Sequence, residues 1–270
     1  MDRKTNGKRL QGKIPIKSLK GKLAILCDFD GTVTIEEVSV SLLKKYTGEH
    51  WLKADRDLYS GKITIRETMR REFALLKAPR AEMEEFVRSI NLRQGFREFA
   101  KAAKKGGSPL VIASEGLDFY IDAFLKHYGL DVEFRTNRAI FTDAGIKVEY
   151  PYSWEECDKC GNCKYAHLMN FKRQGYTVVY IGDGISDRCP ARKADILFAR
   201  NGLFEYCRRE GIECIPYENF DDVMNYLWPK PDGVKRKEPT PPRGRKRIRA
   251  GAAGGTSRGK RRAPGPRRKR

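Results

Sequence analysis

An apolar run that ends in two aspartates is the feature that most constrains this fold. Residues 23–27 are continuously apolar, and Asp28 and Asp30 follow directly. A continuous rather than alternating apolar run is typical of a strand buried on both faces of a parallel sheet. Gly31 and Thr32 favour a turn after this strand. The pattern therefore predicts two carboxylates at the carboxyl end of a buried strand, pointing the same way because side chains alternate with period two.

Short apolar runs and helical patterns alternate along the rest of the chain. We expect strands at residues 23–27, 109–113, 177–181, 196–199 and 214–216. We expect helices at residues 95–105, 117–128, 164–174 and 203–210. This alternation predicts an α/β fold with a doubly wound parallel sheet. Ligands of such sheets bind beyond the carboxyl ends of the strands.

Two stretches interrupt the alternation. Residues 36–91 carry only helical patterns, so we expect an inserted α-helical cap there. Residues 131–152 have strand composition and a turn at Asp143, Ala144 and Gly145, which predicts a β-hairpin. The expected domains are a basic N-terminal tail at 1–21, a body at 22–228 with its core at 22–35 and 92–228, and a disordered basic tail at 229–270.

The net charge of +20 is concentrated at the two ends of the chain. Residues 229–270 carry seventeen Lys or Arg against Asp232 and Glu238, with almost no apolar side chains that could drive folding. Such a tail is either a solvated extension or a nonspecific contact with nucleic acid or another polyanion. Because no aromatic residue follows Trp228, we expect any such binding to depend on salt and not on base sequence.

Hydropathy and the number of cysteines indicate in which cellular compartment the protein is expected. No apolar stretch reaches the roughly twenty residues that span a bilayer, and no signal-type segment follows the basic N-terminus. The seven cysteines are an odd number, which argues against a secreted disulfide framework. We therefore expect a cytoplasmic protein without membrane contact. The sequence leaves the oligomeric state open.

Residues with reactive or charged side chains also follow the other expected strands. They are Ser114, Glu115 and Gly116 after the second strand, Lys164 at the start of a helix, and Asp183 and Asp187 in GDGISD after the third long strand. The carboxyl ends of these strands meet at one crevice, so we expect this set to converge with Asp28 and Asp30. Taken alone, Ser114 would be an ordinary helix cap and Lys164 a solvated helix residue.

Four carboxylates in one crevice repel one another, and one lysine does not balance them. Mg²⁺ suits such a site because it binds a few carboxylates and keeps waters and a substrate phosphate. A carboxylate beside the ion can attack phosphorus and form an aspartyl phosphate. A second carboxylate can protonate the leaving oxygen and then deprotonate the attacking water. The set therefore predicts Mg²⁺-dependent hydrolysis of a phosphate ester.

Residues 22–228 resemble the haloacid dehalogenase (HAD) superfamily of phosphatases, which has four motifs. The order and spacing of four features match these motifs: DFDGT, the serine of ASEG (Ser114), Lys164 and GDGISD. The resemblance implies a phosphoric monoester hydrolase with Asp28 as nucleophile and Asp30 as general acid and base. The implied phosphate site consists of Ser114, Glu115, Gly116 and Lys164. The implied metal residues are Asp28, Asp30 through its backbone carbonyl, Asp183, and Asp187 as the group that orients metal-bound water or the lysine.

Within the superfamily, the helical insert resembles the subclass with its cap directly after the first motif, which includes phosphoserine phosphatases. Residues 157–164 and 194–223 look most like 2-hydroxy-3-keto-5-methylthiopentenyl-1-phosphate phosphatases of methionine salvage. The segment GDGISDRCP also resembles phosphoethanolamine and phosphocholine phosphatases. For a phosphoserine phosphatase, Glu37 has the spacing of the amine contact and Arg71, or Arg70, would bind the carboxylate. A favourable interaction of Glu37 with a helix dipole is an equal alternative.

Two further readings stay open. Cys157, Cys160 and Cys163 have knuckle-like spacing, and Cys189 or His167 would complete a structural Zn²⁺ site. The alternative is a reduced loop with buried small side chains, or an occasional disulfide. An alternative of another class is a nucleic-acid-associated scaffold that acts through its basic tails. In a non-catalytic scaffold we would expect at least one of Asp28, Asp30 and Lys164 to be replaced, but all three are present.

Overall fold

The computed structural model describes residues 22–229, so the tails expected at 1–21 and 229–270 lie outside the described residues except for Pro229. Seven strands form one sheet in the order β4-β3-β2-β1-β5-β6-β7. They are β1 (Leu23–Cys27), β2 (Leu110–Leu117), β3 (Glu133–Thr142), β4 (Gly145–Glu149), β5 (Thr177–Gly182), β6 (Ile196–Ala199) and β7 (Ile215–Pro216). Neighbouring strands pair in parallel except β3 and β4, which form the expected antiparallel hairpin.

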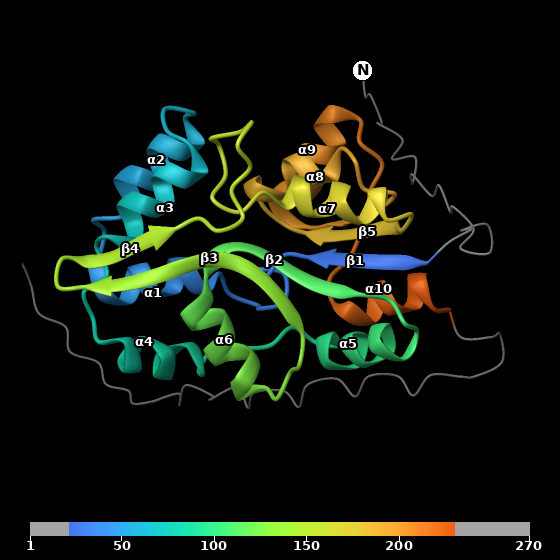
Figure 1. Cartoon of the computed structure of the whole chain (residues 1–270), viewed down its shortest axis with the longest axis horizontal. Coiled ribbons are helices and arrows are strands. Elements are labelled where there is room, and N and C mark those ends of the chain that lie inside the picture. Colours follow the sequence, from blue (N-terminus) through green and yellow to red (C-terminus); the bar gives the residue numbers. More distant parts are fainter. Residues whose placement is uncertain (1–21, 230–270) are drawn as a thin grey trace, which may run out of the picture. The chain divides into compact units, whose positions relative to one another are not determined.

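Helices cover both faces of the sheet (Figure 1). One face carries α5 (Phe96–Lys105), α6 (Asp118–His127) and α10 (Phe220–Leu227). The other carries α7 (Lys164–Arg173), α8 (Arg188–Ala191) and α9 (Asn201–Glu210). This arrangement confirms the predicted doubly wound α/β fold. The short α8 and the C-terminal α10 were not among the expected helices.

The central strand β1 belongs to both cores, which explains why its sequence does not alternate. Ile25 and Cys27 pack in the cluster on one face, and Ala24 and Leu26 pack in the cluster on the other. All four side chains are fully buried. A strand with two buried faces has no solvent side on which polar residues would be favoured.

The predicted helical insert lies between β1 and α5. It consists of α1 (Val38–Thr47), α2 (Leu52–Tyr59), α3 (Ile65–Phe73) and α4 (Arg80–Val87). The side chain of Thr64 caps α3 by accepting a hydrogen bond from the Glu67 N–H at 3.2 Å. Met69 and Phe73 on α3 are buried and join the same apolar cluster as one face of the sheet. The inserted α-helical cap of the predicted fold is therefore confirmed.

The β3–β4 hairpin supports this cap (Figure 1). The Tyr150 hydroxyl donates a hydrogen bond to the Arg66 carbonyl oxygen at 2.9 Å. Gly145, at the start of β4, has a φ of +123° and lies so close to Ala74 that a Cβ atom would overlap the Ala74 carbonyl. A glycine is needed here both for the backbone conformation and for the close approach.

The second strand is longer than its apolar run. β2 continues to Leu117, four residues beyond the end expected at residue 113, and its register against β3 shifts between Ala113 and Leu117. Ser114, Glu115 and Gly116 therefore lie in the irregular end of a strand rather than after it. Such irregular strand ends change the direction in which side chains point.

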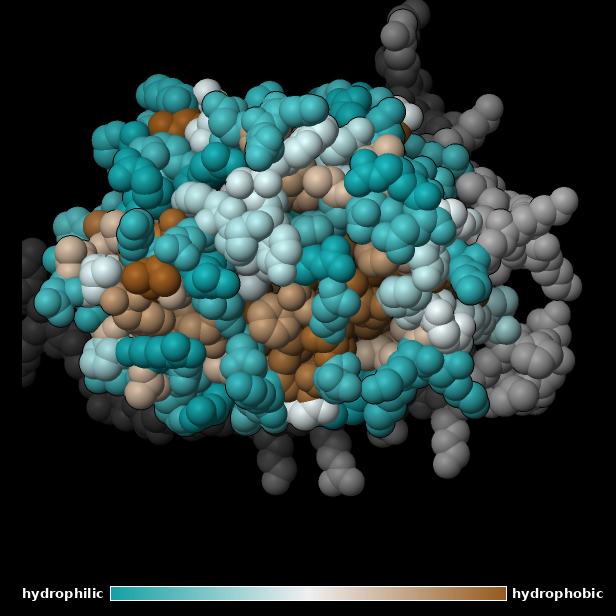
Figure 2. Space-filling model, in the orientation of Figure 1, coloured by the Kyte–Doolittle hydropathy of each residue, from teal (hydrophilic) through white to brown (hydrophobic). Residues whose placement is uncertain are grey.

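None of the helices within residues 22–229 is both long and apolar enough to cross a bilayer. Figure 2 shows polar residues over most of one face of the molecule, with apolar residues reaching the surface in the middle of the view.

The close contact between Gly145 and Ala74 predicts that alanine at position 145 destabilises the fold more than alanine at other glycines with positive φ. Gly145→Ala should lower the free energy of unfolding by roughly 2 kcal/mol or more, because it adds a steric overlap to a strained backbone. Gly129→Ala is the matched control, since Gly129 also has a positive φ of +59° but no atom within 4 Å of a Cβ. It should cost only about 1 kcal/mol. Urea unfolding of both variants measures the difference, and equal losses would contradict the contact.

Candidate active site

The carboxyl end of β1 meets the amino end of α7 in a buried ion pair. The Lys164 Nζ lies 2.6 Å from Asp28 Oδ1 and 2.7 Å from Asp187 Oδ1. It also donates a hydrogen bond to the Ser186 hydroxyl at 2.9 Å. Lys164 is 2% exposed and Asp28 5%. The structure thus brings together three of the residues predicted to converge.

Asp183 follows β5 and lies beside this pair. Its Oδ1 accepts a hydrogen bond from the Thr32 hydroxyl at 3.0 Å, and its Oδ2 accepts one from the Asn201 amide at 3.2 Å. Gly31 has a φ of +72°, and a Cβ at that position would overlap the Asp183 carboxylate. Asn201 itself has a φ of +46°, a strained conformation that asparagine tolerates better than most residues. Backbone strain at a non-glycine residue such as Asn201, beside Asp183, is often found at functional sites.

Asp187 is saturated with hydrogen-bond donors. Its Oδ1 accepts from Lys164 and, at 2.6 Å, from the Tyr180 hydroxyl. Its Oδ2 accepts from the backbone N–H groups of Asp183 and Gly184, both at 2.9 Å. Asp187 therefore fixes the lysine and the loop that carries Asp183.

One carboxylate oxygen from each of Asp28, Asp183 and Asp187 lies within 4.8 Å of the others, the sole group of this kind among residues 22–229. Burial, and next the negative charge of Asp187, raises the pKa of Asp28 well above its ordinary value. The same two causes raise the pKa of Asp183 to about 6. Burial alone would also raise the pKa of Asp187, but Lys164 lowers it below the ordinary value. Three carboxylates against one ammonium leave excess negative charge, and hard carboxylate oxygens fit a cation such as Mg²⁺.

The Asp30 carboxylate points away from this group. Its Oδ1 accepts hydrogen bonds from the N–H groups of Val38 and Ser39 at the start of α1, at 2.7 and 3.3 Å. Its Oδ2 accepts one from the Tyr120 hydroxyl at 2.8 Å. Burial raises the pKa of Asp30, although these hydrogen bonds lower it. As a metal residue, Asp30 is consistent only with the backbone-carbonyl role that the resemblance implied.

The end of β2 supplies the next group of predicted residues. The Ser114 hydroxyl is buried and accepts a hydrogen bond from the Gly116 N–H at 2.9 Å. One oxygen of Glu115 accepts from the N–H groups of Gly161 and Asn162 at 3.0 and 3.1 Å. The other oxygen is buried without a hydrogen-bond partner. Ser114, Glu115 and Gly116 all line the same cavity as Asp28 and Asp183.

This cavity, of about 170 Å³, lies between the strand ends and the helical insert. Its apolar wall is formed by Val40, Leu58, Ile65, Met69 and Phe73. Its acidic wall on the cap side is formed by Glu37, Asp55 and Glu72. No lysine or arginine of the described chain lines it.

The structure brings Glu37 to the cavity, as predicted, but not Arg71 or Arg70. Both arginines pair with Glu67 on the exposed side of α3, at 2.6 and 2.7 Å. Because α3 turns Thr68, Met69 and Glu72 toward the cavity, its arginines point elsewhere. The expectation that Arg71 contacts a substrate carboxylate is therefore corrected.

Burial is the main cause of unusual acidities in the cap. It raises the pKa of Glu37 to about 7, with Asp30 as the next cause. It raises the pKa of Glu72 to about 8, with Asp55 and Glu37 as the next causes. The cavity thus holds several carboxyl groups that resist ionisation, and a cation or a positively charged group would favour their charged form.

Several residues of the site were not predicted from the sequence. Buried Arg93 donates hydrogen bonds to the carbonyl oxygens of Gly31, Thr32 and Thr34, between 2.7 and 2.8 Å, and so fixes the loop after β1. Tyr120, Tyr180 and Asn201 each bond to a site carboxylate. Of the residues that contact the site carboxylates without having been predicted, only Thr32 belongs to a motif, DFDGT, from which its position near the site follows.

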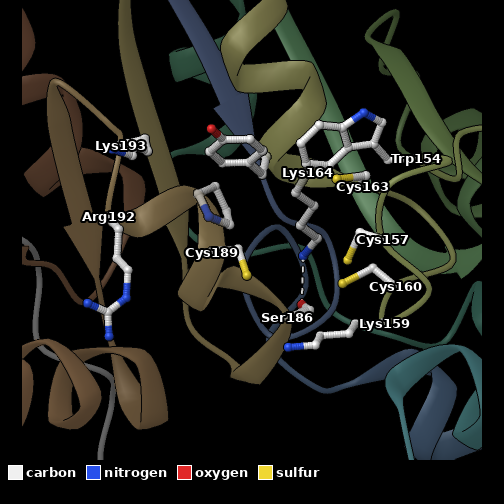
Figure 3. Close-up of a pocket in the computed structure, with 12 residues that line it drawn as sticks. Trp154, Cys157, Lys159, Cys160, Cys163, Lys164, Ser186, Cys189, Arg192 and Lys193 are labelled. Atoms are coloured by element: carbon white, nitrogen blue, oxygen red, sulfur yellow. Dashed lines mark hydrogen bonds between the residues drawn. The ribbon is translucent and has the colours of Figure 1, made fainter.

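The predicted cysteines lie on another side of Lys164. Cys157, Cys160, Cys163 and Cys189 line a cavity of about 330 Å³ (Figure 3). His167 does not line it, because its ring bonds to the Asn162 side chain at 2.6 Å.

Comparison with known proteins agrees with this geometry. The family model of the haloacid dehalogenase-like hydrolases matches residues 25–192. A 2-hydroxy-3-keto-5-methylthiopentenyl-1-phosphate phosphatase of Geobacillus kaustophilus is 33% identical over 211 residues, which cover 76% of this chain and 96% of the relative. A protein of the same name from Bacillus pumilus is 31% identical over 206 residues, which cover 75% of this chain and 89% of the relative.

A solved structure titled as a phospho-aspartyl intermediate analogue of phosphoserine phosphatase matches with a TM-score of 0.60 at 24% identity. The match covers 77% of this chain and 99% of that chain. A likeness at this level of identity shows a shared fold.

The raised pKa of Glu72 predicts a pH-dependent stability. Below its ordinary pKa of 4.5 the carboxyl is protonated in both the folded and the unfolded chain, so no charge is buried. Between pH 4.5 and about 8 the unfolded chain is ionised and the folded chain is not, so the folded state loses stability as the pH rises, until the loss is complete at about pH 8. Glu72→Gln removes this cost. It should raise the free energy of unfolding by about 1–2 kcal/mol at pH 8.5 and hardly at all at pH 4.5.

Urea unfolding of the substrate-free protein across this pH range measures the effect. Glu98→Gln is the control, because Glu98 is exposed on α5. A Glu72→Gln effect that is the same at every pH would show that packing, not charge, is responsible.

Proposed function

The chain belongs to the haloacid dehalogenase-like hydrolases and is a phosphoric monoester hydrolase; we propose that its substrate is 2-hydroxy-3-keto-5-methylthiopentenyl-1-phosphate and that it acts with Mg²⁺. The observation that carries the mechanism is the Lys164 ammonium between Asp28 and Asp187, with Asp183 alongside. This arrangement supports the proposed roles of Asp28 as nucleophile, Lys164 as phosphate-binding cation and the aspartates as metal ligands. The substrate name rests on relatives that are 29–33% identical.

In the first step, we infer that Asp28 attacks phosphorus and forms an aspartyl phosphate. The bond between phosphorus and the leaving oxygen breaks, and protonated Asp30 gives that oxygen its proton. The raised pKa of Asp30 suits an acid that must carry a proton before reaction. Lys164 and the Ser114 hydroxyl are the groups available to bind the transferring phosphoryl oxygens.

In the second step, Asp30 takes a proton from water, which attacks phosphorus and releases Asp28 and inorganic phosphate. Asp28, Asp183 and the backbone carbonyl of Asp30 are the groups that would hold Mg²⁺, which would neutralise charge on the phosphoryl oxygens. Asp187 already accepts four hydrogen bonds and positions Lys164. Thr32 and Asn201 keep Asp183 in place.

The apolar wall of the cavity supports the proposed substrate. Five apolar side chains of the cap face the catalytic aspartates across a cavity of about 170 Å³. A methylthio group is apolar, so its burial against this wall would be favourable. The keto and hydroxyl groups of the same substrate would still find polar partners at Ser39 and Thr68.

The acidic wall favours a second candidate, a substrate whose leaving group carries a positive charge. Glu37, Asp55 and Glu72 have no arginine or lysine beside them in the cavity lining. Phosphoethanolamine and phosphocholine would supply a cation, and the Tyr59 and Phe73 side chains suit a quaternary ammonium group. Phosphoserine fits less well, because its carboxylate would meet these acids without an arginine to bind it.

The cellular setting also remains a proposal. All seven cysteines lie within the described residues and none forms a disulfide, which supports a reducing compartment such as the cytosol. A contact of the basic tails with nucleic acid or another polyanion is compatible with an active enzyme.

Phosphate release from a panel of substrates tests the proposal. The panel contains the methionine-salvage enol-phosphate, phosphoserine, phosphoethanolamine, phosphocholine and an aryl phosphate, each with and without Mg²⁺. We expect the enol-phosphate to have the highest kcat/KM. Asp28→Asn should lower kcat by at least about a thousandfold because it removes the nucleophile. Asp122→Asn, on the surface of α6, is the matched control and should leave activity unchanged.

Each other outcome has a definite meaning. Faster turnover of phosphoethanolamine or phosphocholine would replace the first candidate with the second. Phosphate release that survives in Asp28→Asn would contradict the nucleophile. If the wild type hydrolyses nothing, a scaffold that works through its basic tails becomes the better account.

A further inference from the structure

The second cavity beside Lys164 is lined by four cysteines that the proposed reaction does not use. Cys157, Cys160 and Cys163 lie in the cysteine loop, residues 150–163, which joins β4 to α7. Cys189 comes from α8, on the other side of the same cavity. Figure 3 shows the four sulfur atoms around the Lys164 side chain. Two segments far apart in the sequence thus contribute thiols to one space.

The number and kind of these side chains match a known class of ligand. The loop cysteines recur every third residue, and together with Cys189 they make four thiols, which is the closed ligand set of a structural zinc site. All four are free cysteines. Thiolates select soft or borderline cations such as Zn²⁺ over Mg²⁺, so this site would not compete with the carboxylate group for the same ion.

The charges around the cavity also suit an occupied site. Four thiolates and one divalent cation together carry a net charge of −2. Lys159 and Lys193 line the same cavity and would offset part of it. Among residues 22–229, no acidic residue lines the cavity, although Lys164 pairs with Asp28 and Asp187, and Arg192 pairs with Glu210, outside that lining.

We propose that Cys157, Cys160, Cys163 and Cys189 bind one thiophilic divalent cation of the Zn²⁺ class. No three of these sulfur atoms lie within 4.8 Å of one another, since only the aspartate group of residues 22–229 meets that distance. In a tetrahedral Zn²⁺ site the sulfur atoms are about 3.8 Å apart. Binding therefore draws the cysteine loop and α8 together.

The position of the site gives the ion a structural consequence. Cys163 directly precedes Lys164, so the ion would fix the start of α7 and the backbone of that lysine. Arg66 of the cap donates hydrogen bonds to the Cys160 carbonyl oxygen at 2.9 and 3.1 Å and to the Cys157 carbonyl oxygen at 3.4 Å. The cysteine loop thus connects the catalytic lysine to α3, and the ion would act as a positioning element rather than in the reaction.

Elemental analysis of the full chain, purified without chelators under reducing conditions, tests the proposal. We expect close to one zinc per chain. Cys160→Ser and Cys189→Ser should each weaken Zn²⁺ about tenfold or more in competition with a chromogenic chelator. Cys207→Ser is the matched control, because Cys207 is buried on α9 and does not line the cavity. Asp28→Asn should keep its zinc, which separates this site from the proposed Mg²⁺ site.

Replacement of the ion by Co²⁺ gives a second measurement on the wild type, should a variant fail to fold. Thiolate-to-cobalt charge-transfer bands are expected at one equivalent of Co²⁺, and Cys207→Ser should retain them. Less than stoichiometric zinc after reconstitution with excess Zn²⁺, or an absence of these bands, would overturn the proposal. A loss of two hydrogens in the intact mass of protein prepared without oxidant would also overturn it, because it would show a disulfide instead.

Discussion

The buried contact of Lys164 with Asp28 and Asp187 is the interaction on which the site depends. Taking such charges out of water is costly unless they are paired and hydrogen-bonded. One ammonium contacts Asp28 and Asp187 but balances only one of the three negative charges, and Asp187 has the most hydrogen-bond donors around it. Asp28 and Asp183 keep the uncompensated charge, as their raised pKa values show. The same imbalance that would destabilise an empty site makes it attractive to a cation.

The sheet topology is what makes this contact possible. β1 lies in the middle of the sheet, and β5 pairs with it in parallel from Leu23 to Cys27, so that their carboxyl ends are adjacent. Arg93 holds the loop after β1 through three carbonyl oxygens, and it comes from the segment that follows the helical insert. The chain therefore runs from β1 into the cap, and Arg93, which follows the cap, then fixes the loop after β1. The cavity between cap and core follows from this path.

The parts of this structure that were predictable from sequence are those encoded locally. The apolar run before Asp28 predicts a buried strand, and strand ends in such sheets meet at one edge. Arg93 and Tyr120 carry no comparable signal, because their roles arise from contacts with residues 59 to 90 positions away. Arg71 was misplaced for the same reason, since the rotation of a cap helix about its axis is set by tertiary packing. Glu72, the next residue, faces the cavity instead.

Glu115 shows that the substrate cavity and the cysteine loop share a wall. One of its carboxylate oxygens accepts hydrogen bonds from the N–H groups of Gly161 and Asn162 in that loop, while the residue lines the cavity beside Ser114. Arg66 holds the same loop from the cap side. The loop is therefore in contact with the end of β2, with the start of α7 at Lys164 and with the cap. The position of the cysteine loop thus couples the relative positions of these three parts.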